Sequence, residues 1–284
     1  MKQVMKEIQE RLVGHLEKIV RERDPYYASG GHLFVREYIR SHFSKFGEVI
    51  THEFEVRNNQ HQNLILNIES NSNRQRSPII IGAHYDAVAG CVGADDNGTG
   101  VAVLLELATY LSANPVNYPI QLVAFDMEEY GLLGSSAYAE KLKSQQQKLR
   151  LMISLEMLGY CDRTPNSQNY PIGLDKFYPN TGDFIGLIGN IPTIPDLIHF
   201  QHHLKSVVAC EWLPAGWRGL AIPDTRRSDH APFWDADYKA MMITDTAHMR
   251  NPYYHTSKDR LETLDLEFLT NVYQGLILGI VSLN

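Results

Sequence analysis

The chain has 284 residues, of which 44% are hydrophobic and 21% are charged, as in an ordinary globular protein. Its 33 Asp and Glu residues outnumber its 26 Lys and Arg residues, which leaves a formal net charge of −7. The chain therefore lacks the excess of basic residues with which proteins bind nucleic acid or anionic membranes, so we expect neither as a partner. Three widely spaced cysteines without a CxxC pair argue against a disulfide framework and against a thiolate zinc site.

The first 24 residues are amphipathic and charged throughout. They lack the apolar core and the cleavage site of a signal peptide, and no apolar stretch of the chain reaches transmembrane length. We therefore expect a cytoplasmic protein. The sequence carries no signal for its oligomeric state.

Hydrophobic periodicity predicts two N-terminal helices, over residues 4–21 and 31–46, separated by a polar turn. Residues 49–56, VITHEFEV, alternate like a half-buried strand. Short aliphatic runs predict further strands, at 63–70, 77–86, 118–127 and 150–158. Helices are expected between and after these runs, at 98–114 and 134–147.

The C-terminal part continues this alternation, with strand candidates at 183–190, 206–213 and 239–246 and helices at 194–205 and 264–282. Strands that alternate with helices predict an α/β fold, in which a doubly wound, mostly parallel mixed sheet is flanked by helices on both faces. No linker, internal repeat or low-complexity segment interrupts the sequence. We expect a single catalytic domain over 1–284, whose N-terminal segment 1–46 is helical.

Polar groups stand where the predicted strands end. Three strands run into GAHYD (82–86), FDMEE (125–129) and SLE (154–156), and a glycine-rich turn, GADDNGTG (93–100), opens a helix. In a doubly wound sheet, ligands bind outside the carboxyl ends of the strands. Taken singly, each group has a plain structural explanation, such as a surface histidine, an N-cap or a solvated strand end. Together the carboxylates would repel one another in one crevice, and a bound cation removes that repulsion.

Histidines and carboxylates without cysteine suit Zn²⁺, with Mn²⁺ or Co²⁺ as possible substitutes. The candidate residues outnumber the ligands of a single tetrahedral zinc ion. Two zinc ions about 3.5–4 Å apart, bridged by one carboxylate, would use them and leave one glutamate free. Adjacent Glu128 and Glu129 point in different directions at a strand end, so one can bind metal while the other holds the catalytic water.

Six motifs in order resemble the two-zinc aminopeptidases: GAHYD, GADDNGTG, FDMEEYGLLGS, ISLEMLGY, SDHAPF and YYHTSKD. The resemblance covers roughly residues 30–280. This superfamily of zinc exopeptidases also contains bacterial leucyl aminopeptidases, glutamate carboxypeptidases, glutaminyl cyclases and the transferrin receptor. The resemblance implies a metal-dependent aminopeptidase that removes N-terminal residues from peptides, with two zinc ions per chain.

The resemblance also implies a role for each residue that matches a motif. The residues that match metal ligands are His84, Asp96, Glu129, Glu156 and His255. Among them, Asp96 is expected to bridge the two ions, and the bond from Asp96 to Asn97 is expected to be cis. Glu128 matches the general base, and Asp86 matches the carboxylate that orients a histidine ligand. Tyr254 matches the phenol that polarises the scissile carbonyl.

Glu156 departs from the family pattern, because the aminopeptidases usually carry aspartate at this position. The carboxylate is kept but lies one methylene further from the backbone, and related two-zinc exopeptidases accept glutamate there. We expect Glu156 to share a zinc ion with His84. Arg227, in RRSDHAPF, is a candidate for binding a main-chain carbonyl or carboxylate of the substrate, and a surface salt bridge would explain it equally well.

Three other functions remain open. A glutaminyl cyclase would use a single zinc ion to cyclise N-terminal glutamine, but such enzymes usually carry tryptophan where this chain has Tyr254. A carboxypeptidase acting on small peptides would need an arginine patch for the substrate carboxylate, for which the sequence offers only Arg218, Arg226 and Arg227 nearby. A binding module without catalysis would have lost metal ligands, whereas every metal position here keeps a competent one.

Overall fold

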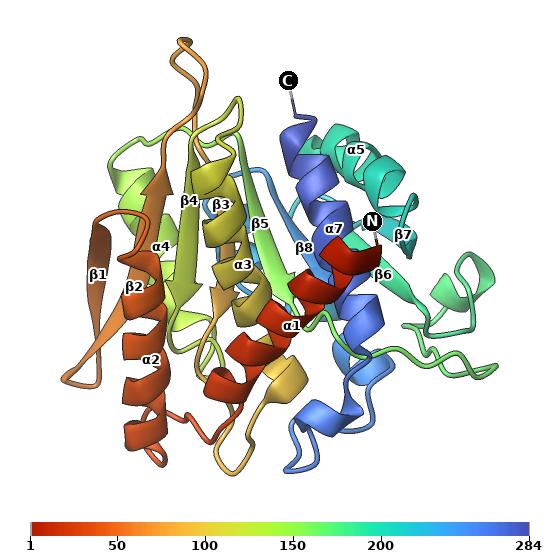
Figure 1. The fold of residues 1–284 in the computed structure, drawn as a ribbon. Coiled ribbons are helices and arrows are strands. Elements are labelled where there is room, and N and C mark those ends of the chain that lie inside the picture. The colour runs from red at the N-terminus through yellow and green to blue at the C-terminus, as the bar shows by residue number, and fades with distance from the viewer. Residues whose placement is uncertain (1, 284) are drawn as a thin grey trace.

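The computed structural model describes residues 2–283. Among these residues, eight strands form one sheet in the order β1-β2-β4-β3-β5-β8-β6-β7 (Figure 1). The strands span Val49–Val56 (β1), Asn59–Ile68 (β2), Ile79–His84 (β3), Ile120–Phe125 (β4), Leu151–Glu156 (β5), Phe184–Gly189 (β6), Ala209–Pro214 (β7) and Ala240–Thr244 (β8). Each of them overlaps a strand that the sequence predicts.

The sheet is mixed, as predicted. β3 lies between β4 and β5 and is parallel to both, and β8 continues the parallel order beyond β5. The antiparallel hairpin of β1 and β2 adds to one side of this centre, and the pair of β6 and β7 adds to the other side, with β6 antiparallel to β8. The parallel centre therefore brings the carboxyl ends of β3, β4 and β5 to one edge of the sheet.

Helices cover both faces of the sheet (Figure 1). One face carries α1 (Lys2–Ile19), α2 (Ser29–Phe43), α3 (Gly100–Ala113), α5 (Ile194–Leu204) and α7 (Leu266–Val281), whose buried aliphatic side chains join one core cluster. The other face carries α4 (Leu133–Ser144) and α6 (His230–Asp235), which pack aromatic and aliphatic side chains into a second cluster. The doubly wound architecture is thereby confirmed.

Two contacts explain how the helices of the larger layer pack. Glu106 of α3 is buried, and it accepts a hydrogen bond from Nε of Arg11 on α1 at 2.9 Å. Gly275 of α7 lets α5 approach closely, because a Cβ atom there would lie 2.5 Å from Cδ2 of Leu204. The first contact pairs a buried charge, and the second fits two apolar helix faces together.

Two features differ from the prediction. β2 begins at Asn59 rather than at residue 63, because its first residues pair with β1 across a hairpin. The turn residues Arg57 and Asn58 have φ angles of 51° and 66°, which suit the tight turn of such a hairpin. α6 escapes prediction because its six residues are too few to show a helical period. The assignment of 1–284 to one domain stays a prediction, and residues 1 and 284 lie outside the described residues.

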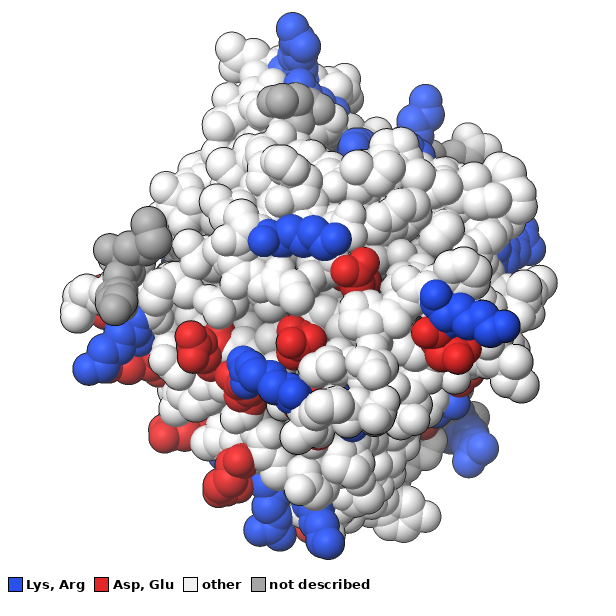
Figure 2. All heavy atoms as spheres, turned by 90° about the vertical axis from the view of Figure 1, so that its right-hand side faces the viewer, with Lys and Arg blue, Asp and Glu red and all other residues white. Residues whose placement is uncertain are grey.

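None of the helices within residues 2–283 is both long and apolar enough to span a membrane. On the face that carries β7 and α5, Lys and Arg side chains are interspersed with Asp and Glu on a largely uncharged surface (Figure 2). The expectation that neither nucleic acid nor a membrane is a partner stays a prediction.

Candidate metal and catalytic site

The centre of the site lies at the ends of three parallel strands. His84 is the last residue of β3, Glu156 is the last residue of β5, and Glu128 and Glu129 lie in the turn that follows β4. Because the three strands are parallel neighbours, these side chains meet at one edge of the sheet. The turn after β4 bends sharply at Met127, whose φ angle is 60°. The convergence that the sequence predicts is therefore present.

Asp96 enters the site from the glycine-rich turn Ala94–Thr99, which leads from β3 into α3. The Asp96–Asn97 peptide bond is cis, as the resemblance implies. Asp259, near the C-terminus, accepts hydrogen bonds from the backbone N–H groups of Asp95 and Asp96 at 2.9 and 3.1 Å. A carboxylate from a distant segment therefore holds the backbone on which Asp96 stands.

Asp96 lies between the two histidines. Its Oδ1 is 3.3 Å from Nε2 of His84, and its Oδ2 is 3.0 Å from Nε2 of His255. Nε2 of His84 also lies 3.6 Å from Oε1 of Glu156, and Nε2 of His255 lies 3.1 Å from Oε2 of Glu129. The five predicted ligands thus form two groups that share Asp96. We call His84 with Glu156 the His84 half, and Glu129 with His255 the His255 half.

Glu128 borders the His84 half. Its Oε2 is 4.0 Å from Nε2 of His84. Potential ligand atoms of His84, Glu128 and Glu156 all lie within 4.8 Å of one another, as do those of His84, Asp96 and Glu129. Glu128 therefore faces the space that these ligand atoms surround, where a general base would have to stand.

The polar atoms of the site fit a divalent cation. Nε2 of His84 and Oε1 of Glu129 are buried and have no hydrogen-bond partner among the described residues. The side chains of Asp96, Glu128 and Glu156 are 6%, 11% and 7% exposed, so several carboxylates meet where little water reaches them. Buried polar atoms without partners and crowded negative charges are costly unless a cation joins them. Histidine and carboxylate donors suit zinc.

Burial and crowding shift the pKa values of these groups. Burial raises the pKa of Glu129 to about 7. Burial also raises the pKa of Glu128 well above its usual range, and the neighbouring Glu129 and Glu156 add to this effect. Burial alone would raise the pKa of Asp96 as well, but the neighbouring imidazoles of His255 and His84 lower it. Burial and crowding therefore disfavour the charged form of Glu128 in the absence of a cation.

Asp86 holds the turn after β4. Its Oδ1 accepts a hydrogen bond from the backbone N–H of Glu128, and its Oδ2 accepts one from that of Glu129, both at 3.1 Å. Its Oδ1 also lies 3.4 Å from Nδ1 of His84. The sequence predicts that Asp86 orients the histidine. The structure adds that the same carboxylate fixes the backbone of both glutamates.

Tyr254 covers the His255 half. Its ring stacks on the imidazole of His255, with the ring centroids 3.8 Å apart. Burial raises the pKa of Tyr254, so its hydroxyl keeps its proton and can donate a hydrogen bond. Nη2 of Arg227 donates to this hydroxyl at 3.5 Å. That contact places Arg227 at the edge of the site.

Sequence reasoning missed three residues that surround the site. Oγ of Ser228 donates to Oε2 of Glu156 at 2.6 Å and shares a second hydrogen bond with Oγ of Ser154 at 2.8 Å. Ser228 lies inside the SDHAPF motif, so its position carried a signal. Arg23 and Asp24 lie in the polar turn before α2, where nothing in the local sequence marks them as different from other charged turn residues.

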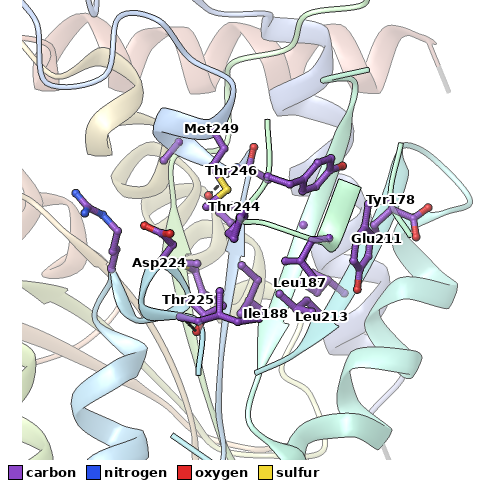
Figure 3. A pocket seen from close by; sticks show the side chains of 18 of the residues that line it. Tyr178, Leu187, Ile188, Glu211, Leu213, Asp224, Thr225, Thr244, Thr246 and Met249 are labelled. Atoms are coloured by element: carbon purple, nitrogen blue, oxygen red, sulfur yellow. Dashed lines mark hydrogen bonds between the residues drawn. The ribbon is translucent and has the colours of Figure 1, made fainter. Parts of the chain in front are cut away.

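A pocket lies next to the ligand groups, and Glu156, Arg227 and Tyr254 are among its lining residues. Figure 3 shows its side around Leu187, Ile188 and Thr244. Its floor is built by β6, β7 and β8 and includes Leu187, Ile188, Leu213, Met242 and Thr244. Tyr170, Leu174 and Tyr178, from the segment between β5 and β6, also line the pocket, as do Asp224 and His248. The pocket therefore combines an apolar floor with polar groups next to the ligand atoms.

Residues 63–185 match the sequence profile of peptidase family M28. The chain is 38% identical over 213 residues to the uncharacterized protein YfbL of Escherichia coli (strain K12), an alignment that covers 70% of this chain and 65% of YfbL. It is 29% identical over 235 residues to aminopeptidase YwaD of Bacillus subtilis (strain 168), with 78% of this chain and 46% of YwaD covered. The chain thus spans less than two thirds of the length of either relative.

Solved structures share the fold. LapA of Legionella pneumophila has a TM-score of 0.75 at 20% identity, over 98% of this chain and 73% of LapA. BSAP, a zinc aminopeptidase from Bacillus subtilis, has a TM-score of 0.58 at 24% identity, over 78% of this chain and 50% of BSAP. A glutaminyl cyclase from Bacteroides thetaiotaomicron has a TM-score of 0.69 at 16% identity, over 99% of this chain and 98% of the cyclase.

Proposed function

Because the chain belongs to peptidase family M28, within the superfamily of zinc exopeptidases, we propose that it is a zinc-dependent aminopeptidase. The observation that carries the proposal is the placement of Asp96, whose two carboxylate oxygens lie 3.3 and 3.0 Å from Nε2 atoms of two different histidines. A carboxylate shared by two ligand groups is what a two-ion hydrolytic site requires. The relative YwaD, an aminopeptidase, supports the direction of cleavage.

In this proposal His84 and Glu156 hold one zinc ion, Glu129 and His255 hold the other, and Asp96 contacts both. Mn²⁺ or Co²⁺ would serve as substitutes with the same donors. When bound, zinc supplies Lewis-acid polarisation of a peptide carbonyl and lowers the pKa of water.

Glu128 is the proposed general base. Its carboxylate takes a proton from the attacking water and returns it to the leaving amine. The hydroxyl of Tyr254 donates a hydrogen bond to the carbonyl oxygen of the substrate as negative charge develops there. Asp86 accepts a hydrogen bond from the backbone N–H of Glu128 and lies 3.4 Å from Nδ1 of His84, so one carboxylate is placed to orient both base and ligand.

The substrate is proposed to be a peptide with a free N-terminus. Its ammonium group would pair with the carboxylates of Glu128 and Glu156, because a cationic amine favours a site rich in negative charge. Its first side chain would enter the pocket beside Glu156, whose apolar floor favours large apolar side chains. Arg227, at the edge of the site, is placed to bind a main-chain carbonyl of the peptide.

The test is a panel of aminoacyl chromogenic substrates, assayed with a chelator and again after zinc is added back. We expect apolar aminoacyl substrates to be hydrolysed, chelation to abolish the activity and zinc to restore it. N-acetylation of a peptide substrate should abolish cleavage, because the ammonium group is lost. Efficient cleavage of the blocked peptide would contradict an aminopeptidase and leave a carboxypeptidase or an internal amide hydrolase acting at the same site.

A glutaminyl cyclase is the second candidate, because the Bacteroides thetaiotaomicron cyclase matches this chain over nearly the full length of both. A cyclase would need one zinc ion, for which Asp96, Glu129 and His255 suffice. Tyr254 counts against it, since the cyclases usually carry tryptophan there. Cyclisation of a glutaminyl peptide by protein that holds one zinc ion per chain would favour the cyclase, whereas hydrolysis by protein that holds two would favour the aminopeptidase.

A further inference from the structure

Arg23 is a buried arginine that donates most of its hydrogen bonds to backbone carbonyl groups of the site, and one to the carbonyl oxygen of Arg21. It lies in the connection between α1 and α2 and is fully buried. Its Nε donates to the carbonyl oxygen of Tyr85 at 2.9 Å, and its Nη2 donates to those of Gly93 and Asp96 at 2.8 and 3.1 Å. Its Nη1 donates to the carbonyl oxygen of Val92. One planar guanidinium group therefore joins several carbonyl groups at once.

These carbonyl groups belong to the two backbone segments that carry proposed ligands. Tyr85 directly follows His84 at the end of β3, and Gly93 precedes the turn that contains Asp96. Gly93 has a φ angle of 55°, and a Cβ atom there would lie 2.8 Å from Nη2 of Arg23. Glycine at this position therefore makes room for the guanidinium group as well as for the turn.

Arg23 also places a permanent positive charge behind an acidic site. Burial lowers the pKa of its guanidinium group, while the carboxylates of Asp96, Asp259, Asp86 and Glu129 act in the opposite direction. An arginine stays charged in proteins, and a buried charge is costly unless opposite charges and hydrogen bonds compensate it. The carboxylates therefore stabilise the guanidinium group, which in turn reduces the repulsion among them.

Asp24, the next residue, contacts the other turn of the site. Its Oδ2 accepts a hydrogen bond at 2.7 Å from the hydroxyl of Tyr130, which directly follows Glu129. Its Oδ1 accepts hydrogen bonds from the backbone N–H groups of Tyr26 and Tyr27 at 2.8 and 2.7 Å. The carboxylate is thus fixed at one end by its own turn and bound at the other end to the segment of Glu129.

We propose that Arg23 and Asp24 are positioning residues, which hold the turns of Asp96 and Glu129 at the mutual distance that metal binding needs. This inference rests on the proposed function, because it requires a site that binds zinc. Both residues lie outside residues 63–185, the part of the chain that matches the family profile. The connection between α1 and α2 therefore acts on the site through the segments that carry the ligands.

The test is the zinc affinity of Arg23→Lys, measured by competition with a chromophoric chelator. Lysine keeps the positive charge but lacks the planar fork that joins both segments. We expect zinc to bind about 10–100-fold more weakly, as when residues that orient ligands are lost in other metal sites. The far-ultraviolet circular dichroism spectrum should stay unchanged, while the visible spectrum of the Co²⁺-substituted protein should shift.

Arg11→Lys is the matched control. Arg11 is also an N-terminal arginine, but it binds the carboxylate of Glu106 between α1 and α3 rather than a backbone carbonyl of the site. We expect this variant to keep the zinc affinity and the Co²⁺ spectrum of the unaltered protein. An equal loss of zinc affinity in both variants would overturn the proposal, because it would reflect the docking of α1.

Tyr130→Phe tests Asp24 by removing a single hydroxyl from a partly exposed side chain. Loss of one hydrogen bond to a carboxylate should weaken zinc binding by about threefold to tenfold. Unchanged zinc affinity in both Arg23→Lys and Tyr130→Phe would overturn the proposal. An Arg23→Lys protein that fails to fold in excess zinc would also overturn it, because Arg23 would then serve folding alone. An unaltered protein that binds no zinc would overturn the proposed function itself.

Discussion

The two halves of the site come from different parts of the fold. His84 and Glu156 end neighbouring strands at the centre of the sheet, and the side chain of His84 is 1% exposed. His255 lies in the irregular segment between β8 and α7, and its side chain is 33% exposed. Strand pairing thus builds the His84 half, whereas the His255 half joins Glu129, in the turn after β4, to a residue of this irregular segment. A metal site can combine a rigid inner position with a more adaptable outer one.

The loop of His255 is nevertheless tied to the glycine-rich turn. Asn251 donates a hydrogen bond from Nδ2 to Oδ2 of Asp95 at 2.8 Å, and Asp259 binds the backbone N–H groups of Asp95 and Asp96. These contacts lie on both sides of His255 along the chain. They bring His255 to Asp96, so the loop is positioned by the turn that it helps to hold.

Glu128→Gln should have the largest effect on turnover. It should lower catalysis without weakening zinc binding in either half. We expect turnover to fall by about 10²–10⁴-fold, because the amide cannot accept the proton, while the zinc content stays nearly unchanged. Steady-state kinetics and metal analysis of the same sample check this. The control, Glu129→Gln, should instead lose zinc from the His255 half. Near-normal turnover of Glu128→Gln would show that Glu128 is not the base.

Tyr254→Phe probes the loop that carries the His255 half. We expect kcat to fall by on the order of 10²-fold with little change in KM, since the lost hydrogen bond forms only as charge develops on the carbonyl oxygen. Tyr253→Phe, at the neighbouring position, should behave like the unaltered protein. A lowered unfolding midpoint with unchanged kcat would instead assign Tyr254 to loop packing.

Asp86→Asn should weaken zinc binding in the His84 half more than in the His255 half. Asp86 contacts the imidazole of His84, so we expect the zinc ion of the His84 half to bind about 10–100-fold more weakly. The other ion should be affected less, because Asp86 reaches Glu129 only through its backbone N–H. Calorimetric titration with zinc resolves the two affinities, and an equal loss of both would contradict this assignment.

Removal of zinc by a chelator should abolish activity but should change the backbone only slightly and locally. After zinc is removed, amide exchange should become severalfold faster over 250–260 but change little over 79–84, because the hydrogen bonds of the sheet persist without metal. Hydrogen exchange followed by mass spectrometry, with and without chelator, measures both segments together. Equal acceleration in both would mean that the sheet itself depends on the metal.

Strand ends are the part of the site that the sequence reveals best. The aliphatic run before His84 and the run before Glu156 both end in strands where predicted, and parallel pairing then brings the two side chains together. β1 matches its prediction at both ends, over residues 49–56. Local patterns succeed here because burial of a strand depends on its own side chains.

His255 and Arg23 are residues whose place in the structure the local sequence pattern does not predict. His255 takes its role as a metal ligand from the resemblance to a family motif, since it lies in a loop without any periodic signal. Arg23 is fully buried although it stands among charged and polar turn residues, because its partners in the site are carbonyl groups more than 60 positions away in the chain. Contacts between segments so far apart in sequence leave no mark on the local pattern.

Asp96 has a consequence for how the site fills. If two ions bind as proposed, both draw on one carboxylate, so each ion changes the affinity of the other by the same factor. The first ion fixes the orientation of Asp96 and thereby assists the second, but it also withdraws negative charge from the shared group and repels a second cation. The affinity of one half should therefore differ between protein whose other half is filled and protein whose other half is empty, and the sign of that difference identifies the stronger term.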